Sequence, residues 1–189
     1  PNDPATAPIG KPDEEIFAVR FMGHRAFIVT FLQIDPLYVI DLSDAENPAI
    51  ADELEVPGFS TYLHPIDDNY LLGIGSDANG WGWASGVKAS LYDISDISAP
   101  SEIRNIVFDE GYTWSPATSD LRAMSFLRSS ADQLRFTMPV SLYSDDWNWQ
   151  HEGLYLFEVN GLASNTADLE EAGVVISEER SDNLFWSQY

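Results

Sequence analysis

Two loops that each carry a pair of tryptophans contain the residues best suited to bind a ligand. Residues 76–86 read SDANGWGWASG and residues 144–153 read SDDWNWQHEG, so each loop has Ser-Asp, then Trp-x-Trp, then Gly. Exposed indole rings are costly to hydrate and are enriched at interfaces, which makes such loops unusual for purely solvated turns. The candidate ligand-binding or partner-binding residues are Trp81, Trp83, Trp147, Trp149, Asp77, Asp145 and Asp146.

The acidic side chains of these loops indicate which ligands would suit them. Aromatic rings beside carboxylates fit a protein, a peptide, a glycan or a cationic group, the last through cation–π contacts. Glu152 adds a further carboxylate to the second loop. The alternative is that the indoles pack against the body of the fold and bind nothing. The sequence leaves both interpretations open.

A calcium site is a weaker hypothesis for the first of these loops. Asp77-Ala78-Asn79-Gly80 begins like a calcium-binding loop of the EF type, which collects oxygen ligands from closely spaced Asp and Asn residues. The later ligands and the closing Glu are absent at the required distance. Asp77 and Asn79 are therefore weak Ca²⁺ candidates, and we expect no other cofactor.

The residue types give little support to catalysis. The three histidines are isolated from one another, and the chain contains neither HExxH nor GxSxG; they are His24, His64 and His151. We therefore expect a non-catalytic protein. The rival hypothesis is a glycan-active or metal-dependent enzyme on the same Trp-rich face, which would require convergent carboxylates or a bound metal.

Composition restricts the partners further. Acidic residues outnumber basic ones by 31 to 9 and the net charge is −22, so the surface repels nucleic-acid phosphates. No run approaches the roughly 18 apolar residues of a membrane-spanning helix, and we expect no membrane insertion. Cysteine is absent, which excludes disulfides and Cys-type zinc sites. An acid-rich, lysine-poor chain suits salty or extracellular surroundings.

An internal repeat predicts the elements that position the loops. Residues 37–50 read LYVIDLSDAENPAI and residues 89–103 read ASLYDISDISAPSEI. We expect each aspartate to end a strand and to accept hydrogen bonds from the following turn, while the proline stops the turn before the next strand. These structural turn residues are Asp41, Ser43 and Pro48 in the first copy, and Asp93, Ser95 and Pro100 in the second.

Around this repeat, short β-rich runs alternate with turns in cycles of four, as in the blades of a β-propeller. Runs such as 27–29 and 70–72 are apolar on both faces, which fits stacked sheets better than a sandwich. We predict an all-β, propeller-like fold. Its segments are a linker or processed region at 1–15, blade one at about 16–56, blade two at about 60–108, blade three at about 121–178, and the start of another blade at about 183–189.

The repeats also resemble a known family. LYVIDLSDAENP and SLYDISDISAP resemble the LVIVD-type repeat. The longer run from FMGHRAFIVTFLQIDPLYVIDLSD through GFSTYLHPIDDNYLLGIG to GVKASLYDISD is similar to uncharacterised, mostly secreted C-terminal β-propeller domains distantly related to WD-repeats. This resemblance implies a propeller in a secreted or otherwise extracytoplasmic protein. It implies no catalytic residues.

Three blades and one strand are fewer than the four to eight that close a propeller. The chain could be a fragment of a larger propeller, two copies could complete one ring, or a fourth blade could be hidden in unusual sequence. An open stack would expose blade faces and edge strands, which favour pairing. The sequence therefore predicts that copies of the chain can self-associate through open blade edges.

Overall fold

The computed structural model describes residue 9 and residues 15–31, 35–78, 84–108 and 111–179. Within these residues the chain is built from antiparallel strands, and its helical content is two short 3-10 turns, η2 (Pro116–Thr118) and η3 (Leu121–Ala123). No helix in this part of the chain is long and apolar enough to cross a membrane. The linker predicted at 1–15 lies almost entirely outside the described residues, and so does the strand predicted at 183–189.

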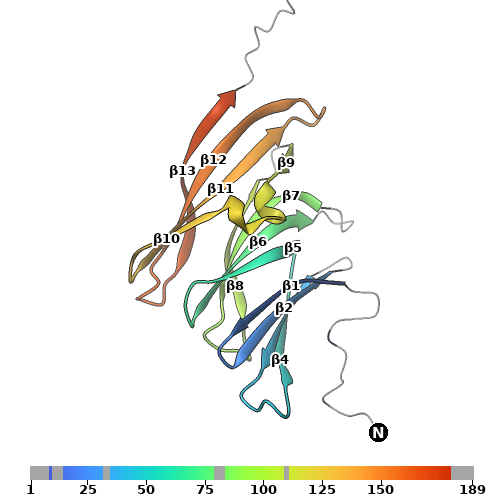
Figure 1. Ribbon diagram of the computed structural model, residues 1–189, viewed down its shortest axis with the longest axis vertical. Helices are drawn as coiled ribbons and strands as arrows, with labels where there is room; N and C mark the ends of the chain where they lie inside the picture. The colour runs from blue at the N-terminus through green and yellow to red at the C-terminus, as the bar shows by residue number, and fades with distance from the viewer. Residues whose placement is uncertain (1–8, 10–14, 32–34, 79–83, 109–110, 180–189) are drawn as a thin grey trace, which may run out of the picture.

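The strands form three sheets in chain order. The first is β1 (Glu15–Met22), β2 (Arg25–Phe31), β3 (Asp35–Asp41) and β4 (Ala49–Val56). The second is β5 (Phe59–Pro65), β6 (Tyr70–Ala78), β7 (Ala84–Asp93) and β8 (Ser101–Phe108). The third is β10 (Ser125–Ser130), β11 (Gln133–Tyr143), β12 (Trp149–Asn160) and β13 (Asp168–Glu179). The sheets stack like fan vanes (Figure 1), which confirms the all-β prediction with three four-stranded units.

The repeated turns are built from short-range hydrogen bonds to aspartate. Asp41 accepts hydrogen bonds from the backbone N–H of Ser43, at 2.8 Å, and from its hydroxyl. Asp93 accepts from the N–H of Ser95 at 2.9 Å and from its hydroxyl at 2.6 Å. The Ser43 hydroxyl and N–H lower the pKa of Asp41, because these donors stabilise its charged form. This local pairing ends β3 and β7 at equivalent points.

A second aspartate and a proline complete each turn. Asp96 accepts hydrogen bonds from the hydroxyl and the N–H of Ser98, and these donors lower the pKa of its carboxyl group. In the first copy, the Asn47 side chain and the Glu46 N–H lower the pKa of Asp44 in the same way. Pro48 and Pro100 lie immediately before β4 and β8. The two hairpins therefore share one construction.

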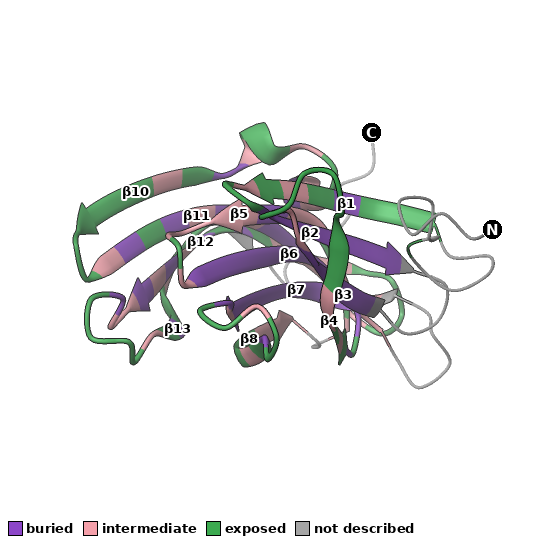
Figure 2. Ribbon diagram, turned by 90° about the horizontal axis from the view of Figure 1, so that it is seen from below, coloured by how far each residue is buried: buried purple, intermediate pink, exposed green. Residues whose placement is uncertain are grey.

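The core lies between the sheets. Buried residues between the first and second sheets include Phe27, Val29, Leu37, Val39, Leu63, Leu71, Tyr92 and Ile94. Those between the second and third include Leu72, Ile74, Val87, Ala89, Leu91, Phe136, Met138, Val140 and Phe157. Figure 2 shows the buried residues running along β6 and β7, which are covered on both faces. This explains their nearly continuous apolar sequence.

The third sheet differs from the predicted boundaries. The first strand was expected to begin at 121, but Asp120 caps residues Leu121–Ala123 as a 3-10 turn and β10 begins at Ser125. The fourth strand, β13, pairs with β12 from Asp168 to Glu179 and so extends one residue past the predicted end of the blade at about 178. A further strand, β9 (Tyr112–Trp114), lies outside the three predicted blades. That short strand pairs with the end of β11.

Candidate functional site

Strand β9 joins the rims of the second and third sheets. Its central residue, Thr113, lies opposite Leu142 of β11. The Thr113 hydroxyl donates to the Phe108 carbonyl at 2.8 Å and accepts from the Val87 N–H at 2.9 Å. Strand β9 therefore connects Val87 of β7 and Phe108 of β8 in the second sheet with the end of β11 in the third (Figure 1).

Trp147 stands out at this rim. The turn that carries it is closed by the Ser144 N–H donating to the Asn148 carbonyl, and by the Trp147 N–H donating to the Ser144 carbonyl, both at 2.8 Å. Trp147 has a φ of 60°, a left-handed conformation that is uncommon for a non-glycine residue. Its ring stacks on Tyr112 with centroids 3.7 Å apart, and it is 67% exposed. The turn thus presents an indole to solvent.

The neighbouring tryptophans are arranged differently from expectation. Trp149 is not in a loop: it begins β12, opposite Tyr143, and is half-buried. Trp114, which the sequence analysis did not select, pairs with Ser141 and is 55% exposed. The alternating Tyr-Thr-Trp pattern that follows Gly111 was the available signal. The rim therefore carries an exposed aromatic set drawn partly from β9.

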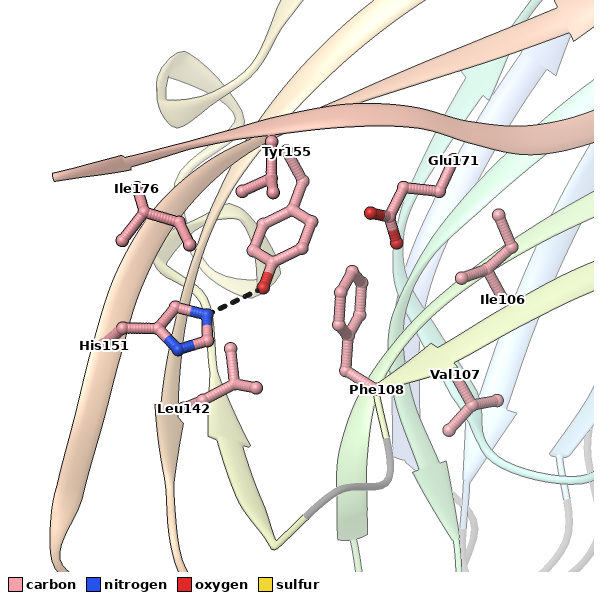
Figure 3. Close-up of a pocket in the computed structure, with 9 residues that line it drawn as sticks. Ile106, Val107, Phe108, Leu142, His151, Tyr155, Glu171 and Ile176 are labelled. Carbon is pink, nitrogen blue, oxygen red and sulfur yellow. Dashed lines mark hydrogen bonds between the residues drawn. The ribbon is translucent and has the colours of Figure 1, made fainter. Parts of the chain in front are cut away.

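A cavity of about 390 Å³ opens between the second and third sheets (Figure 3). Its apolar walls come from β8 and β13 and include Ile106, Phe108, Val174 and Ile176. Its polar lining residues are His151, Tyr155 and Glu171. We call this cavity the interblade pocket.

An aromatic contact and a hydrogen bond, both made by Tyr155, shape the interblade pocket. The Phe108 ring meets the Tyr155 ring edge-on, with centroids 4.8 Å apart. The Tyr155 hydroxyl lies 3.0 Å from His151 Nε2, a hydrogen bond in which either atom could be the donor (Figure 3). Because Tyr155 is buried, this bond supplies its hydroxyl with a polar partner.

A β-bulge places Glu171 in the interblade pocket. Leu156 pairs with Gly173 and Phe157 pairs with Glu171, so Ala172 is an extra residue on β13. A bulge of this kind changes the face on which the preceding side chains emerge. Glu171 therefore shares the face of buried Phe157, toward the second sheet, and its carboxylate points into the cavity near Phe108 (Figure 3).

A second cavity, of about 340 Å³, adjoins the interblade pocket. The two share Leu142 and His151, and the second is also lined by Ser144, Asp145 and Gln150. Asp145, a candidate from the sequence, therefore belongs to a hollow. Its neighbour Asp146 is exposed in the turn that carries Trp147.

The other hairpin is only partly described. Asp77 is half-buried near the end of β6 and accepts a long hydrogen bond, 3.5 Å, from the Ser85 hydroxyl. Asn79, Trp81 and Trp83 lie outside the described residues. In the part of the chain that the structure describes, no three His, Cys, Asp or Glu side chains form a group that could hold a metal ion.

Three stacked antiparallel sheets with a four-stranded path, the third with the short β9 added at β11, are the arrangement of propeller blades. The profile of the family described as "Beta propeller domain" matches residues 5–187, and the chain belongs to this family. A propeller domain is consistent with a binding or structural module.

The relatives are uncharacterized archaeal proteins. One from Methanocaldococcus jannaschii is 47% identical over 110 residues, covering 58% of this chain and 17% of that protein. One from Archaeoglobus fulgidus is 49% identical over 111 residues, covering 59% of this chain and 17% of that protein. The match thus spans only 17% of the length of these curated relatives. No solved structure matches the chain significantly.

Proposed function

We propose that this domain is a non-catalytic recognition module that binds a protein, peptide or glycan at the rim where the second and third sheets meet. The observation that carries the proposal is the exposed Trp147–Tyr112 stack beside two adjoining cavities. Stacked rings offer a large, stiff contact surface at low entropic cost, which is why aromatic residues dominate binding hot spots.

The exposure of the aromatic set favours recognition over internal packing. A purely structural role would bury the indoles, whereas Trp147 and Trp114 are both more than half exposed. The left-handed backbone at Trp147 has a cost of order 1 kcal/mol, which such sites tolerate where function requires it. Trp147 thus combines a strained backbone conformation with an exposed indole ring.

The positions of the acids at the rim support binding in preference to hydrolysis. Asp145 and Asp146 are adjacent in one exposed turn. Paired catalytic carboxylates would instead face each other across the substrate, roughly 5 to 10 Å apart. We further propose that the domain needs no cofactor and that its parent protein is extracytoplasmic, an inference supported by the acid-rich, lysine-poor composition and the LVIVD-like repeats.

Fluorescence titration tests the recognition proposal. Wild-type protein, Trp147→Ala and Trp149→Phe are titrated with a panel of glycans, peptides and Ca²⁺. We expect a ligand that changes the emission of wild type and of Trp149→Phe but not of Trp147→Ala. A flat response of wild type across the panel contradicts the proposal, and so does a response that survives in Trp147→Ala with unchanged affinity.

Assembly is a second candidate function, favoured by the outward faces of the stack. The outer face of the third sheet exposes Leu127, Leu154 and Val175. The outer face of the first sheet exposes Val19, Phe21 and Ile50. These side chains form an apolar area on each outward face, which on the third sheet lies beside the polar Glu158, Asn160 and Glu170. The two interfaces inside the stack are apolar.

We propose a second copy of this chain as the occupant of these faces. The third sheet of one copy would pack on the first sheet of the other, in the same way as successive sheets pack within the chain. Two such contacts would give a ring of six sheets, within the usual range of four to eight. The oligomeric state tests this candidate.

A further inference from the structure

We propose that the interblade pocket binds the cationic side chain of a basic polypeptide segment, a lysine or an arginine. This inference rests on the recognition function proposed above and names its partner class. It does not depend on the aromatic stack, because neither Trp147 nor Tyr112 lines the pocket, whose residues come from β8, β11, β12 and β13.

The walls of the pocket suit the long aliphatic stem of such a side chain. Ile106, Val174 and Ile176 offer apolar contacts on two sides, and the Phe108 ring meets the Tyr155 ring edge-on within the pocket. Lysine and arginine bury their methylene groups along apolar surface while the charged end reaches a polar site. Aromatic rings at that end attract a cation further.

Glu171 supplies the charge that the cation requires. Its carboxylate lines the pocket, and it makes no hydrogen bond or ion pair with any residue that the structure describes. Arg104 of β8 is already paired with a different acid of β13, because its Nε lies 3.6 Å from Asp168 Oδ1. A net charge of −22 also attracts basic partners over a longer range.

The shape of the site favours a polypeptide over a free small cation. The adjoining cavity continues from Leu142 and His151 to Ser144, Asp145 and Gln150. Side chains of this kind can hydrogen-bond the peptide groups on either side of the inserted residue. The two cavities together therefore form a groove. The interblade pocket is its apolar part and carries the Glu171 carboxylate.

Binding of short peptides to the 189-residue chain tests the inference. The probes are acetyl-Gly-Gly-X-Gly-Gly-amide with X as lysine, arginine, norleucine or glutamate, followed by calorimetry and by amide NMR shifts at Val174 and Ile176. We expect the lysine or arginine peptide to bind about tenfold more tightly than the norleucine peptide, with affinity falling as salt rises from about 0.05 to about 0.5 M.

Two neighbouring glutamates provide a matched comparison. Glu171→Gln should weaken binding of the basic peptide about tenfold, because a charge-assisted contact is lost. Glu170→Gln should leave affinity unchanged, because Glu170 lies opposite Glu158, on the other face of β13, and accepts from Asn160 Nδ2 at 2.8 Å. Both acids are exposed, so neither change should unfold the protein.

The outcomes separate the two proposals. The proposal that the interblade pocket binds a cationic side chain is wrong if norleucine and basic peptides bind with equal affinity. It is also wrong if Glu171→Gln binds the basic peptide with full affinity. If a Trp147-dependent ligand is found in the same experiments, the recognition function stands and only the partner class is wrong. If neither Trp147 nor Glu171 affects any ligand, both proposals fail.

Discussion

The imidazole of His64 stacks on the ring of Phe126, with centroids 3.7 Å apart and planes 3° from parallel. This pair joins the first strands of the second and third sheets, β5 and β10. The Tyr62 hydroxyl lies 3.1 Å from His64 Nδ1. Burial, with a smaller contribution from the positive charge of Arg20, lowers the pKa of His64 from 6.5 to about 4. The imidazole is therefore neutral at neutral pH.

Acidification should weaken the fold through His64. Since its pKa is about 6.5 in the unfolded chain and about 4 in the folded one, the unfolded state takes up the proton first. The stabilising contribution is complete above pH 6.5 and is lost as the pH falls toward 4. Allowing for partial solvent screening, we expect a loss of about 1 to 2 kcal/mol in the free energy of unfolding.

Urea denaturation between about pH 7.5 and about pH 3.5 measures this loss, since that range brackets the pKa of His64 in the unfolded chain and in the folded chain. His64→Phe keeps a ring against Phe126 and should remove this part of the pH dependence. His24→Gln changes an exposed histidine and should leave the wild-type dependence in place. The assignment to His64 is wrong if wild type and His64→Phe lose stability in parallel.

Removal of Lys88 should destabilise the protein strongly. Its ammonium group lies 3.0 Å from Glu102 Oε1 and donates to the Pro57 carbonyl at 2.7 Å, and its side chain is 5% exposed. Lys88→Met leaves a nearly buried carboxylate and a carbonyl without their partner. We expect a cost of about 3 to 5 kcal/mol in thermal or urea unfolding.

An exposed ion pair supplies the contrast for Lys88. Arg104→Met breaks the pair with Asp168, in which both side chains are more than half exposed, and should cost less than about 1 kcal/mol. The double variant Lys88→Met/Glu102→Leu should recover part of the loss, because no unpaired charge remains. If Lys88→Met and Arg104→Met lower the free energy of unfolding by similar small amounts, the Lys88–Glu102 pair does not stabilise the fold as a buried ion pair.

Gly153→Ala should distort the interblade pocket. A Cβ at this position would lie 2.7 Å from Val174 Cγ2 and 3.1 Å from the edge of the Tyr155 ring, so both side chains must move. We expect a loss of about 1 to 3 kcal/mol in stability and changed methyl NMR shifts at Val174. Leu154→Ala alters the next residue, which faces away from the pocket, and should leave those shifts unchanged. An unaltered Val174 in Gly153→Ala would contradict this geometry.

Self-association should depend on the outward sheet faces. Val175 and Phe21 are 72% and 69% exposed on opposite ends of the stack. If a second copy covers them, sedimentation should detect a dimer that Val175→Glu and Phe21→Glu both abolish, since a charge cannot be buried there without a partner. Leu121→Glu, at an exposed leucine of η3, should not affect it. A wild-type chain that stays monomeric at high concentration rules out this assembly.

Strand positions were readable from the chain because their signals are local. Asp41 and Asp93 bond to serines two residues away, and the prolines that follow begin the next strand, so a repeated phrase predicts a repeated hairpin. The same reasoning failed at residues 121–124, where the capping carboxylate of Asp120 competes with strand formation. It also missed β9, whose alternating signal extends over only three residues.

The candidate site could not be read in the same way. Trp147 was selected from its loop, but its partner Tyr112 lies on a strand that forms only by pairing with β11. Likewise, Glu171 points into a cavity because one extra residue in β13 shifts the register against β12.

The amino-acid sequence by itself determined the all-β class, the hairpins and the acidic surface, because alternation, turn chemistry and charge depend on near neighbours. Only the tertiary structure decided which rims meet, which aromatic rings stack and which carboxylate enters a pocket. Those outcomes depend on bulges and on contacts between residues far apart in the chain, where a shift of one position turns a side chain to the opposite face.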